Sequence, residues 1–308
     1  MRDAFSNALV ALAKADPNVL LLTGDHGYAL FDAFRRECPN QYVNAGIAEQ
    51  NMVGMAAGLA RAGFRPFVYG LSAFIPVRVL EQIKLDVAHD NLPVIFIGDG
   101  AGFVYSHLGT SHQSTEDIAC TRAIPRLRIL SPADRHEMMG CMNLAYELKA
   151  PIYLRIGKSD CGDVHSATLA PLQLGRLLCL RKGAMNQPAL IATGSMVRPA
   201  MNIATDKLDL SVWSAPSIKP LSGDDICNIA AESKGLVVME EHSILGGLGS
   251  AVAEIISEYR PTSILRIGVN DRFTESCGSY GHLLKEHGLD TDTVRLRIQK
   301  FAATDNFN

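Results

Sequence analysis

Short apolar runs alternate with segments of helical spacing along this 308-residue chain. In the first half, the apolar runs cover residues 19–22, 64–69, 92–97, 128–130 and 152–155. Helical spacing is found at residues 77–89 and at residues 134–148, and the second segment starts with a Ser-Pro-Ala-Asp capping signal. Strands that alternate with helices favour a doubly wound α/β fold, in which helices cover both faces of a mostly parallel sheet.

The pattern loosens after residue 157 and then resumes in a second α/β unit. Its apolar runs cover residues 189–192, 210–214, 236–240 and 263–267, and a helix is expected at residues 251–259. A chain of this length exceeds one ordinary hydrophobic core. We therefore expect a mostly parallel-sheet domain at residues 1–165, a linker at 166–187 and a smaller α/β domain at 188–308.

Composition narrows the class of protein. Hydrophobic residues make up 47% of the chain, charged residues 20%, and the formal net charge is −3. This charge gives no electrostatic reason to expect nucleic acid or an anionic membrane as a partner. No apolar run is long enough to span a membrane. The seven cysteines are scattered and form no CxxC pair, which predicts a reducing, cytoplasmic setting without a zinc site or a disulfide framework.

Residues 44–59 place one carboxylate, Glu49, at the head of a helix with almost no polar face. We expect this helix to be buried. Gly54 and Gly58 lie on one side of it, where another backbone can come close. A buried carboxylate must be hydrogen-bonded, paired or protonated. From the residues alone, Glu49 either serves chemistry or complements the positive N-terminus of its helix.

Polar segments follow three of the predicted strands, at residues 23–28, 69–74 and 98–112. The carboxyl ends of parallel strands lie at one edge of a sheet, so active groups should gather there. A Gly-Gly-Leu-Gly turn at residues 246–249 could cradle a phosphate at the start of a helix. Close packing is the favoured interpretation of this turn, because no lysine follows as in a P-loop.

These motifs occur together, in order, in one known family. The chain resembles the C-terminal half of a transketolase over nearly all of residues 2–300. Residues 44–59 match the GIAEQNM-type motif of that family, and residues 111–117 resemble its THQ-x-x-ED segment. Further matches are Ser-Pro-Ala-Asp at 131–134 and Pro-Ile-Tyr-Leu-Arg at 151–155. The resemblance implies a pyrimidine-binding domain followed by the transketolase C-terminal domain.

The resemblance also implies thiamine diphosphate as cofactor. Glu49 matches the catalytic glutamate that hydrogen-bonds the aminopyrimidine ring of this cofactor, and Gln50 follows it in the motif. Phe74 matches an aromatic residue that packs on the pyrimidine. Leu71 stands where a further aromatic often lines that pocket, and Asp25 is kept in the loop after the first strand.

On the substrate side, His112 resembles the catalytic histidine near the donor carbonyl, and His107 is a second candidate in the same loop. Arg2 and Arg155 match two phosphate-contacting arginines. Leu108 replaces an acid that usually contacts a sugar hydroxyl. The substrates implied are therefore small sugars or sugar phosphates, with the phosphate left open.

The other half of such an enzyme is missing. Gly-Asp-Gly at residues 98–100 starts the pattern that holds Mg2+ and the diphosphate, but the paired asparagines expected later are absent at residues 125–130. We expect no metal site in this chain. Instead, an N-terminal-half transketolase subunit should hold the diphosphate and Mg2+, most simply in an α2β2 heterotetramer.

Three interpretations stay open. The first is the C-terminal subunit of a split transketolase, a transferase that moves a two-carbon ketol unit from a ketose or ketose phosphate to an aldose-type acceptor. The second is a beta-type subunit of a 2-oxo acid decarboxylating enzyme, which Leu108 keeps in play. The third is a non-catalytic scaffold, against which the retained Glu49 and His112 argue.

Overall fold

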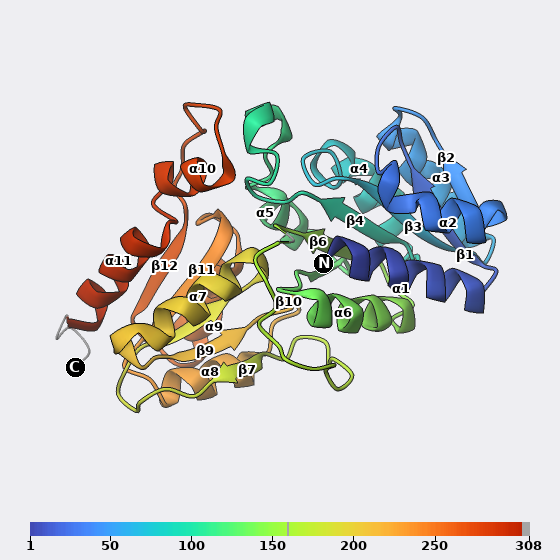
Figure 1. The fold of residues 1–308 in the computed structure, drawn as a ribbon. Coiled ribbons are helices and arrows are strands. Elements are labelled where there is room, and N and C mark those ends of the chain that lie inside the picture. Colours follow the sequence, from blue (N-terminus) through green and yellow to red (C-terminus); the bar gives the residue numbers. More distant parts are fainter. Residues whose placement is uncertain (159, 304–308) are drawn as a thin grey trace.

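The computed structural model describes residues 1–158 and 160–303, which form two mostly parallel sheets covered by helices (Figure 1). The first sheet has seven strands in the order β10-β5-β6-β4-β3-β1-β2. Their bounds are β1 Val19–Thr23, β2 Tyr42–Asn44, β3 Arg65–Leu71, β4 Ile95–Asp99, β5 Arg128–Leu130, β6 Ile152–Ile156 and β10 Ser217–Lys219. The second sheet has five strands in the order β12-β11-β8-β9-β7. These are β7 Leu178–Arg181, β8 Ala189–Ala192, β9 Ser211–Ser214, β11 Leu236–Ser243 and β12 Ile264–Val269.

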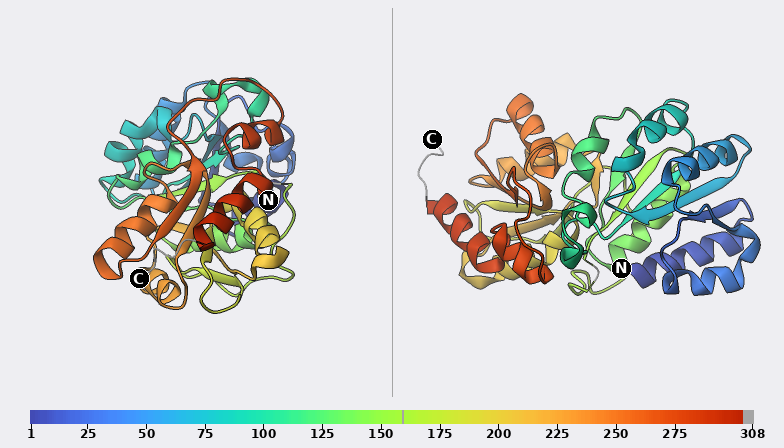
Figure 2. Two further views of the ribbon diagram at one scale, coloured as in Figure 1. Left: turned by 90° about the vertical axis from the view of Figure 1, so that its left-hand side faces the viewer. Right: turned by 90° about the horizontal axis from the view of Figure 1, so that it is seen from above.

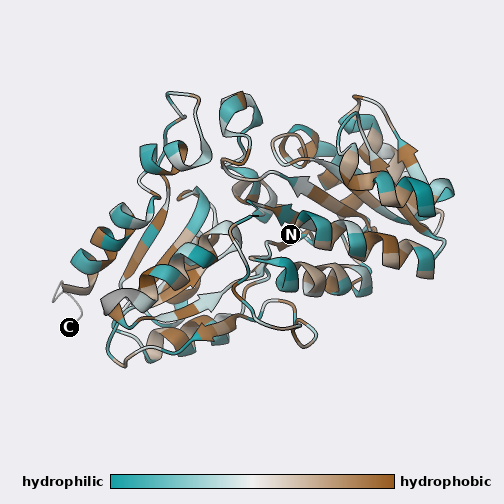
Figure 3. Cartoon of the chain, viewed as in Figure 1, coloured by the Kyte–Doolittle hydropathy of each residue, from teal (hydrophilic) through white to brown (hydrophobic). Residues whose placement is uncertain are grey.

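Alternate residues of each strand face opposite sides of the sheet, and both sides are covered, as a doubly wound fold requires. Leu21 of β1 packs in the core under α1, α2 and α6, whereas Leu22 packs in the core under α3 and α5. The helices are α1 Arg2–Ala15, α2 Asp32–Glu37, α3 Glu49–Arg61, α4 Leu80–Gln82, α5 Asp117–Arg122 and α6 Arg135–Glu147. Figure 3 shows the resulting concentration of hydrophobic residues on the strands. The predicted α/β class is confirmed.

The second sheet is built in the same way. Its helices are α7 Val197–Ile203, α8 Gly223–Ala231, α9 Leu248–Tyr259, α10 Tyr280–Glu286 and α11 Thr291–Ala303. One face packs under α7, α10 and α11, and the other under α8 and α9. Seen from above, the two sheets lie side by side, with the amino terminus near their junction (Figure 2).

The two halves of the chain are joined by more than a linker. Strand β10 comes from the second half but pairs antiparallel with β5 of the first sheet, through Ser217 and Leu130. One hydrophobic core also runs continuously from α3 to α9. Strand β7 lies inside the stretch expected as the linker, and it pairs antiparallel with β9. The boundaries of the two domains stay a prediction.

Helix α3 is buried on one face only, which corrects the sequence-based expectation. Met52, Val53 and Ala56 are buried in the core. Gly54 and Gly58 are exposed, and a Cβ atom added at either would meet no other atom within 4 Å. Small residues made the helix look apolar all round, although its glycine face meets no neighbour among the described residues.

Segment 77–89 is helical as predicted, but not as one α-helix. It runs from a 3-10 turn at Val77–Val79 through α4 into a π-helical turn at Ile83–Ala88. Within the described residues, none of the helices is both long and apolar enough to cross a bilayer.

Candidate functional site

The loops that follow β1, β2, β3 and β4 meet at one edge of the first sheet, as the parallel topology requires. The register aligns the strand ends: Thr23 lies opposite both Asn44 and Tyr69, and Leu71 lies opposite Asp99. The loops after β1 and β2 also touch closely. A Cβ atom at Gly24 would lie 2.9 Å from the carbonyl oxygen of Gly46, so only glycine fits there without a shift.

Four side chains from three of these loops form one contact group, the edge cluster: Glu49, Phe74, Arg78 and His112. Glu49 is the first residue of α3 and is 6% exposed. Its Oε2 atom lies 3.2 Å from Nη1 of Arg78. The guanidinium of Arg78 lies over the ring of Phe74, 4.0 Å from the centroid. The ring of His112 meets Phe74 edge-on, with centroids 5.4 Å apart.

Buried hydroxyl groups hold the two loops that carry Phe74 and His112. Ser72 donates to the hydroxyl of Ser114 over 2.7 Å and lies 3.0 Å from the hydroxyl of Tyr153. The backbones of Gly102 and Ser114 exchange two hydrogen bonds, which close the base of the His112 loop. The loops that carry Phe74 and His112 are therefore held in place by hydrogen bonds at their bases.

The remaining predicted cofactor residues surround this group. Leu71 ends β3 and is half-buried, and its carbonyl accepts from the backbone N–H of Phe74. Gln50 is the exposed second residue of α3. Asp25 is exposed in the loop after β1, where it accepts a hydrogen bond from the hydroxyl of Tyr28.

Sequence reasoning missed two residues of this site, Arg78 and His26. Arg78 stands in a segment expected only as a helix, and no local pattern places it against Glu49. His26 is half-buried, and its Nε2 atom has no hydrogen-bond partner among the described residues. Burial lowers the pKa of His26, although the nearby Glu49 carboxylate works in the opposite direction. Its place in a Gly-rich loop after β1 was the one available signal.

The predicted substrate residues lie apart from one another. His107 is exposed in the same loop as His112. Arg2 is 3.2 Å from Asp99, which also accepts from Tyr69 over 2.7 Å. Burial raises the pKa of Tyr69, and the Asp99 carboxylate raises it further. Arg2 also lines a polar cavity of about 590 Å³ with Gly27 and Tyr28, and the carboxylates of Asp3 and Asp160 line it too.

Arg155 is placed differently from the expectation. Its side chain is buried, and its Nε donates to Asp117 over 2.7 Å. Its Nη2 donates to the backbone carbonyl of Glu241 over 2.8 Å. Burial works to raise the pKa of Asp117, but the Arg155 guanidinium holds it below its ordinary value. The structure thus gives Arg155 a place between the two halves of the chain and does not favour its predicted contact with a substrate phosphate.

The second half of the chain reaches the same edge. Thr274 donates to the side-chain carbonyl of Gln113 over 2.7 Å, directly after His112. A Cβ atom at Gly109 would lie 3.5 Å from the sulfur of Cys277. The loop before α10 and the loop around residue 110 accordingly lie side by side at the top of Figure 1.

The Gly-Gly-Leu-Gly turn is a packing device, as favoured from the sequence. Glu240 accepts from the backbone N–H groups of Leu248 and Gly249, over 2.7 and 2.8 Å, and so occupies the N-terminus of α9. A Cβ atom at Gly247 would collide with this carboxylate. Burial raises the pKa of Glu240 to about 7.

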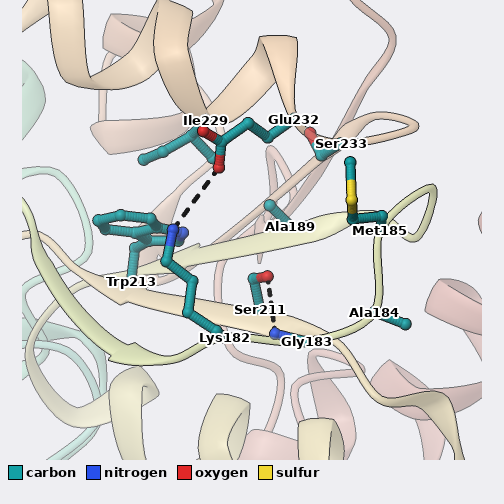
Figure 4. Close-up of a pocket in the computed structure, with 10 residues that line it drawn as sticks. All are labelled: Lys182, Gly183, Ala184, Met185, Ala189, Ser211, Trp213, Ile229, Glu232 and Ser233. Carbon is teal, nitrogen blue, oxygen red and sulfur yellow. Dashed lines mark hydrogen bonds and ion pairs between the residues drawn. The ribbon is translucent and has the colours of Figure 1, made fainter.

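A separate pocket of about 340 Å³ lies on the second sheet, between the segment that follows β7, strands β8 and β9, and α8 (Figure 4). Lys182 lies over the ring of Trp213, 4.8 Å from Nζ to the centroid, and 3.5 Å from Glu232. Neither its lining residues nor its elements belong to the edge cluster, so this pocket has no part in the chemistry of that cluster.

Comparison with known proteins identifies the family to which this chain is related. Residues 1–163 match the family model described as the transketolase pyrimidine binding domain. Residues 180–294 match the model of the transketolase C-terminal domain. The chain belongs to the transketolase family. Membership implies a transferase-type enzyme that depends on thiamine diphosphate.

Several relatives of this transketolase family chain are split proteins of its own length. A putative transketolase C-terminal section from Methanocaldococcus jannaschii is 35% identical, over 97% of this chain and 95% of that protein. One of the subunits of the apulose-4-phosphate transketolase of Phocaeicola vulgatus is 33% identical, over 95% of this chain and 94% of that relative. The 1-deoxy-D-xylulose-5-phosphate synthase of Chlorobium luteolum is 34% identical over 98% of this chain, which spans 48% of that enzyme.

The fold agrees with solved transketolases. A split-gene transketolase, described as an inactive beta4 tetramer, superposes with a TM-score of 0.87 at 32% identity, over 97% of this chain and 96% of that one. A transketolase from Pichia stipitis gives a TM-score of 0.78 at 18% identity, over 98% of this chain and 45% of that one, and shows the fold alone.

Proposed function

We propose that this chain is the C-terminal subunit of a split transketolase that moves a two-carbon ketol unit from a ketose or ketose phosphate to an aldose-type acceptor. The observation that carries this proposal is the edge cluster. A buried carboxylate, an aromatic face and a histidine meet at the sheet edge where a doubly wound fold binds its ligands.

The residues of the edge cluster suit the pyrimidine end of thiamine diphosphate. Glu49 would accept a hydrogen bond from the aminopyrimidine ring and hold or release a proton there, and Phe74 would offer its face for stacking. Leu71, Gln50 and Asp25 would border the ring. His112, beside Phe74, would exchange protons with the donor sugar, and His107 and Arg2 would contact more distant groups. When bound, the cofactor supplies an electron sink for breaking a bond next to a carbonyl.

We further propose an N-terminal-half subunit as partner, which would hold the diphosphate and Mg2+ in an α2β2 heterotetramer. Both matched family models belong to the C-terminal half of a transketolase. The glycine face of α3, the helix that Glu49 begins, is open, as a surface for another chain would be. A relative of similar fold is described as an inactive tetramer of beta chains, which fits a subunit that needs a second kind of chain. The seven cysteines are all free, in line with a cytoplasmic setting.

A 2-oxo acid donor is the second candidate. Leu108, 45% exposed in the His112 loop, stands where the resemblance leads one to expect a sugar-binding acid. An apolar side chain there suits a donor with fewer hydroxyl groups.

The test is to co-express this chain with a chain that carries the diphosphate-binding domain and to supply thiamine diphosphate and Mg2+. Two-carbon transfer is assayed from xylulose 5-phosphate, with pyruvate as the parallel donor. We expect ketol transfer only when both chains are present. Turnover by this chain alone would contradict the split arrangement, and turnover of pyruvate alone would favour the second candidate.

A further inference from the structure

Arg78 fills the space between the carboxylate of Glu49 and the face of Phe74. Its Nη1 atom lies 3.2 Å from Oε2 of Glu49, and its guanidinium carbon lies 4.0 Å from the centroid of the Phe74 ring. The Glu49 side chain is only 7% exposed, so a ligand can approach it from few directions. Arg78 occupies one of these directions.

Arg78 thus pairs with the Glu49 carboxylate and stacks on the Phe74 ring. The proposed function assigns the same two contacts to the aminopyrimidine ring. A guanidinium is planar, carries N–H donors and stacks on aromatic faces. An aminopyrimidine is planar as well, carries an amino group and a ring nitrogen, and stacks in the same way. Two flat groups cannot share one face of Phe74 at a stacking distance of about 4 Å.

We propose that Arg78 is a placeholder: in the chain without cofactor it occupies the pyrimidine position, and it must leave before thiamine diphosphate can bind. This inference rests on the proposed function. The Arg78 side chain is 46% exposed and begins in the short 3-10 turn Val77–Val79, so it has solvent into which it can turn without unfolding a helix.

The placeholder has a physical purpose. With Arg78 in place, the buried Glu49 carboxylate has a cationic partner and the Phe74 face is covered before assembly. The same contacts oppose cofactor binding, because they must be broken first. Arg78 therefore stabilises the chain before assembly and lowers its affinity for the cofactor.

The test is to replace Arg78 by methionine, which keeps an unbranched side chain and removes the guanidinium. Thiamine diphosphate binding to the two-chain complex is measured by titration calorimetry with Mg2+ present. R78M loses an ion pair, whose arginine is about half exposed, and a cation–π contact, so we expect it to bind the cofactor about three- to thirty-fold more tightly. The matched control is R36M, because Arg36 is also exposed and ion-paired but lies on α2, outside the site.

The outcomes separate the two proposals. If the unmodified complex binds no thiamine diphosphate, the proposed function fails. If it binds, and R78M binds equally or more weakly than R36M, the placeholder is wrong and Arg78 instead helps to hold the cofactor or an anionic substrate. Thermal melting of the R78M chain without partner should show a folded protein with a lower midpoint, since Glu49 has lost its cationic partner.

Discussion

At the scale of single residues, the proposed function depends most on Glu49, which would exchange a proton with the aminopyrimidine ring. Glu49→Gln keeps the shape of the side chain but removes the charge and the ability to exchange a proton. We expect ketol transfer by the two-chain complex to fall by about two to four orders of magnitude while the thermal midpoint hardly changes. Glu147→Gln is the control, because Glu147 is exposed at the end of α6. An active Glu49→Gln complex would support the scaffold interpretation.

Arg155 is a second residue whose role can be settled by substitution. Arg155→Met leaves the buried Asp117 without its cationic partner, so we expect a loss of about 3–5 kcal/mol in the free energy of unfolding. Arg176→Met is the matched control. Arg176 also contacts a carboxylate, Asp225, over 2.8 Å, but it is 59% exposed and should contribute at most about 1 kcal/mol. Unchanged stability together with a raised KM for a phosphorylated substrate would restore the phosphate contact predicted from the sequence.

At the scale of elements, helix α3 joins the core on one face and leaves its glycine face open. Gly58→Ala should raise the free energy of unfolding by about 1 kcal/mol in urea titrations, because alanine favours a helix interior and meets no neighbour. Gly63→Ala has equal space but a backbone φ of +96°, so it should lower the same quantity by about 1–2 kcal/mol.

The bulkier Gly58→Leu tests the open face as a partner surface. The chain alone should stay folded, but sedimentation should show that the two-chain complex no longer forms, because the backbones cannot come close. A complex that still assembles would mean that another surface binds the partner.

At the scale of the whole molecule, a buried pair of titratable groups lies where the two halves meet. His242 accepts from the backbone N–H of Ala119 and lies 3.7 Å from Glu240. Burial raises the pKa of Glu240 from 4.5 to about 7 and lowers that of His242 from 6.5 to about 4. As pH rises, stability linked to Glu240 is lost between pH 4.5 and 7, whereas stability linked to His242 is gained between pH 4 and 6.5. The two effects oppose each other.

Glu240→Gln should expose the His242 contribution. We expect the free energy of unfolding of this variant to rise between about pH 4.5 and 6.5 by up to about 1.4 kcal/mol per pH unit, while the unmodified chain changes little over that range. Glu258→Gln, on the exposed side of α9, is the control and should follow the unmodified chain. Equal pH slopes for the Glu240 and Glu258 variants would contradict this account.

The alternation of strands and helices could be predicted because it is a local property. Hydrophobic residues repeat every two residues in strands and every 3.6 residues in helices, and a short stretch of sequence is enough to show either period. Strands β1, β3, β4, β6, β8 and β11 lie where such stretches predicted them. The start of α6 at Asp134 was also local, since this side chain caps the backbone N–H groups of His136 and Glu137. The sheet edge that gathers Glu49, Phe74 and His112 follows from the rule for parallel strands.

The short strands β2, β7 and β10 were missed, because each lies at the edge of its sheet, carries at least one polar residue and so shows no continuous buried apolar run. Glu49 at the head of a helix, and the family to which the motifs belong, were determined by the sequence itself. Only the tertiary structure decided that Arg78 covers Glu49, that Arg155 is buried against Asp117 and that Gly58 stays open. Each of these facts depends on which distant segments pack together, and such contacts are fixed by burial over the whole chain rather than by any local pattern.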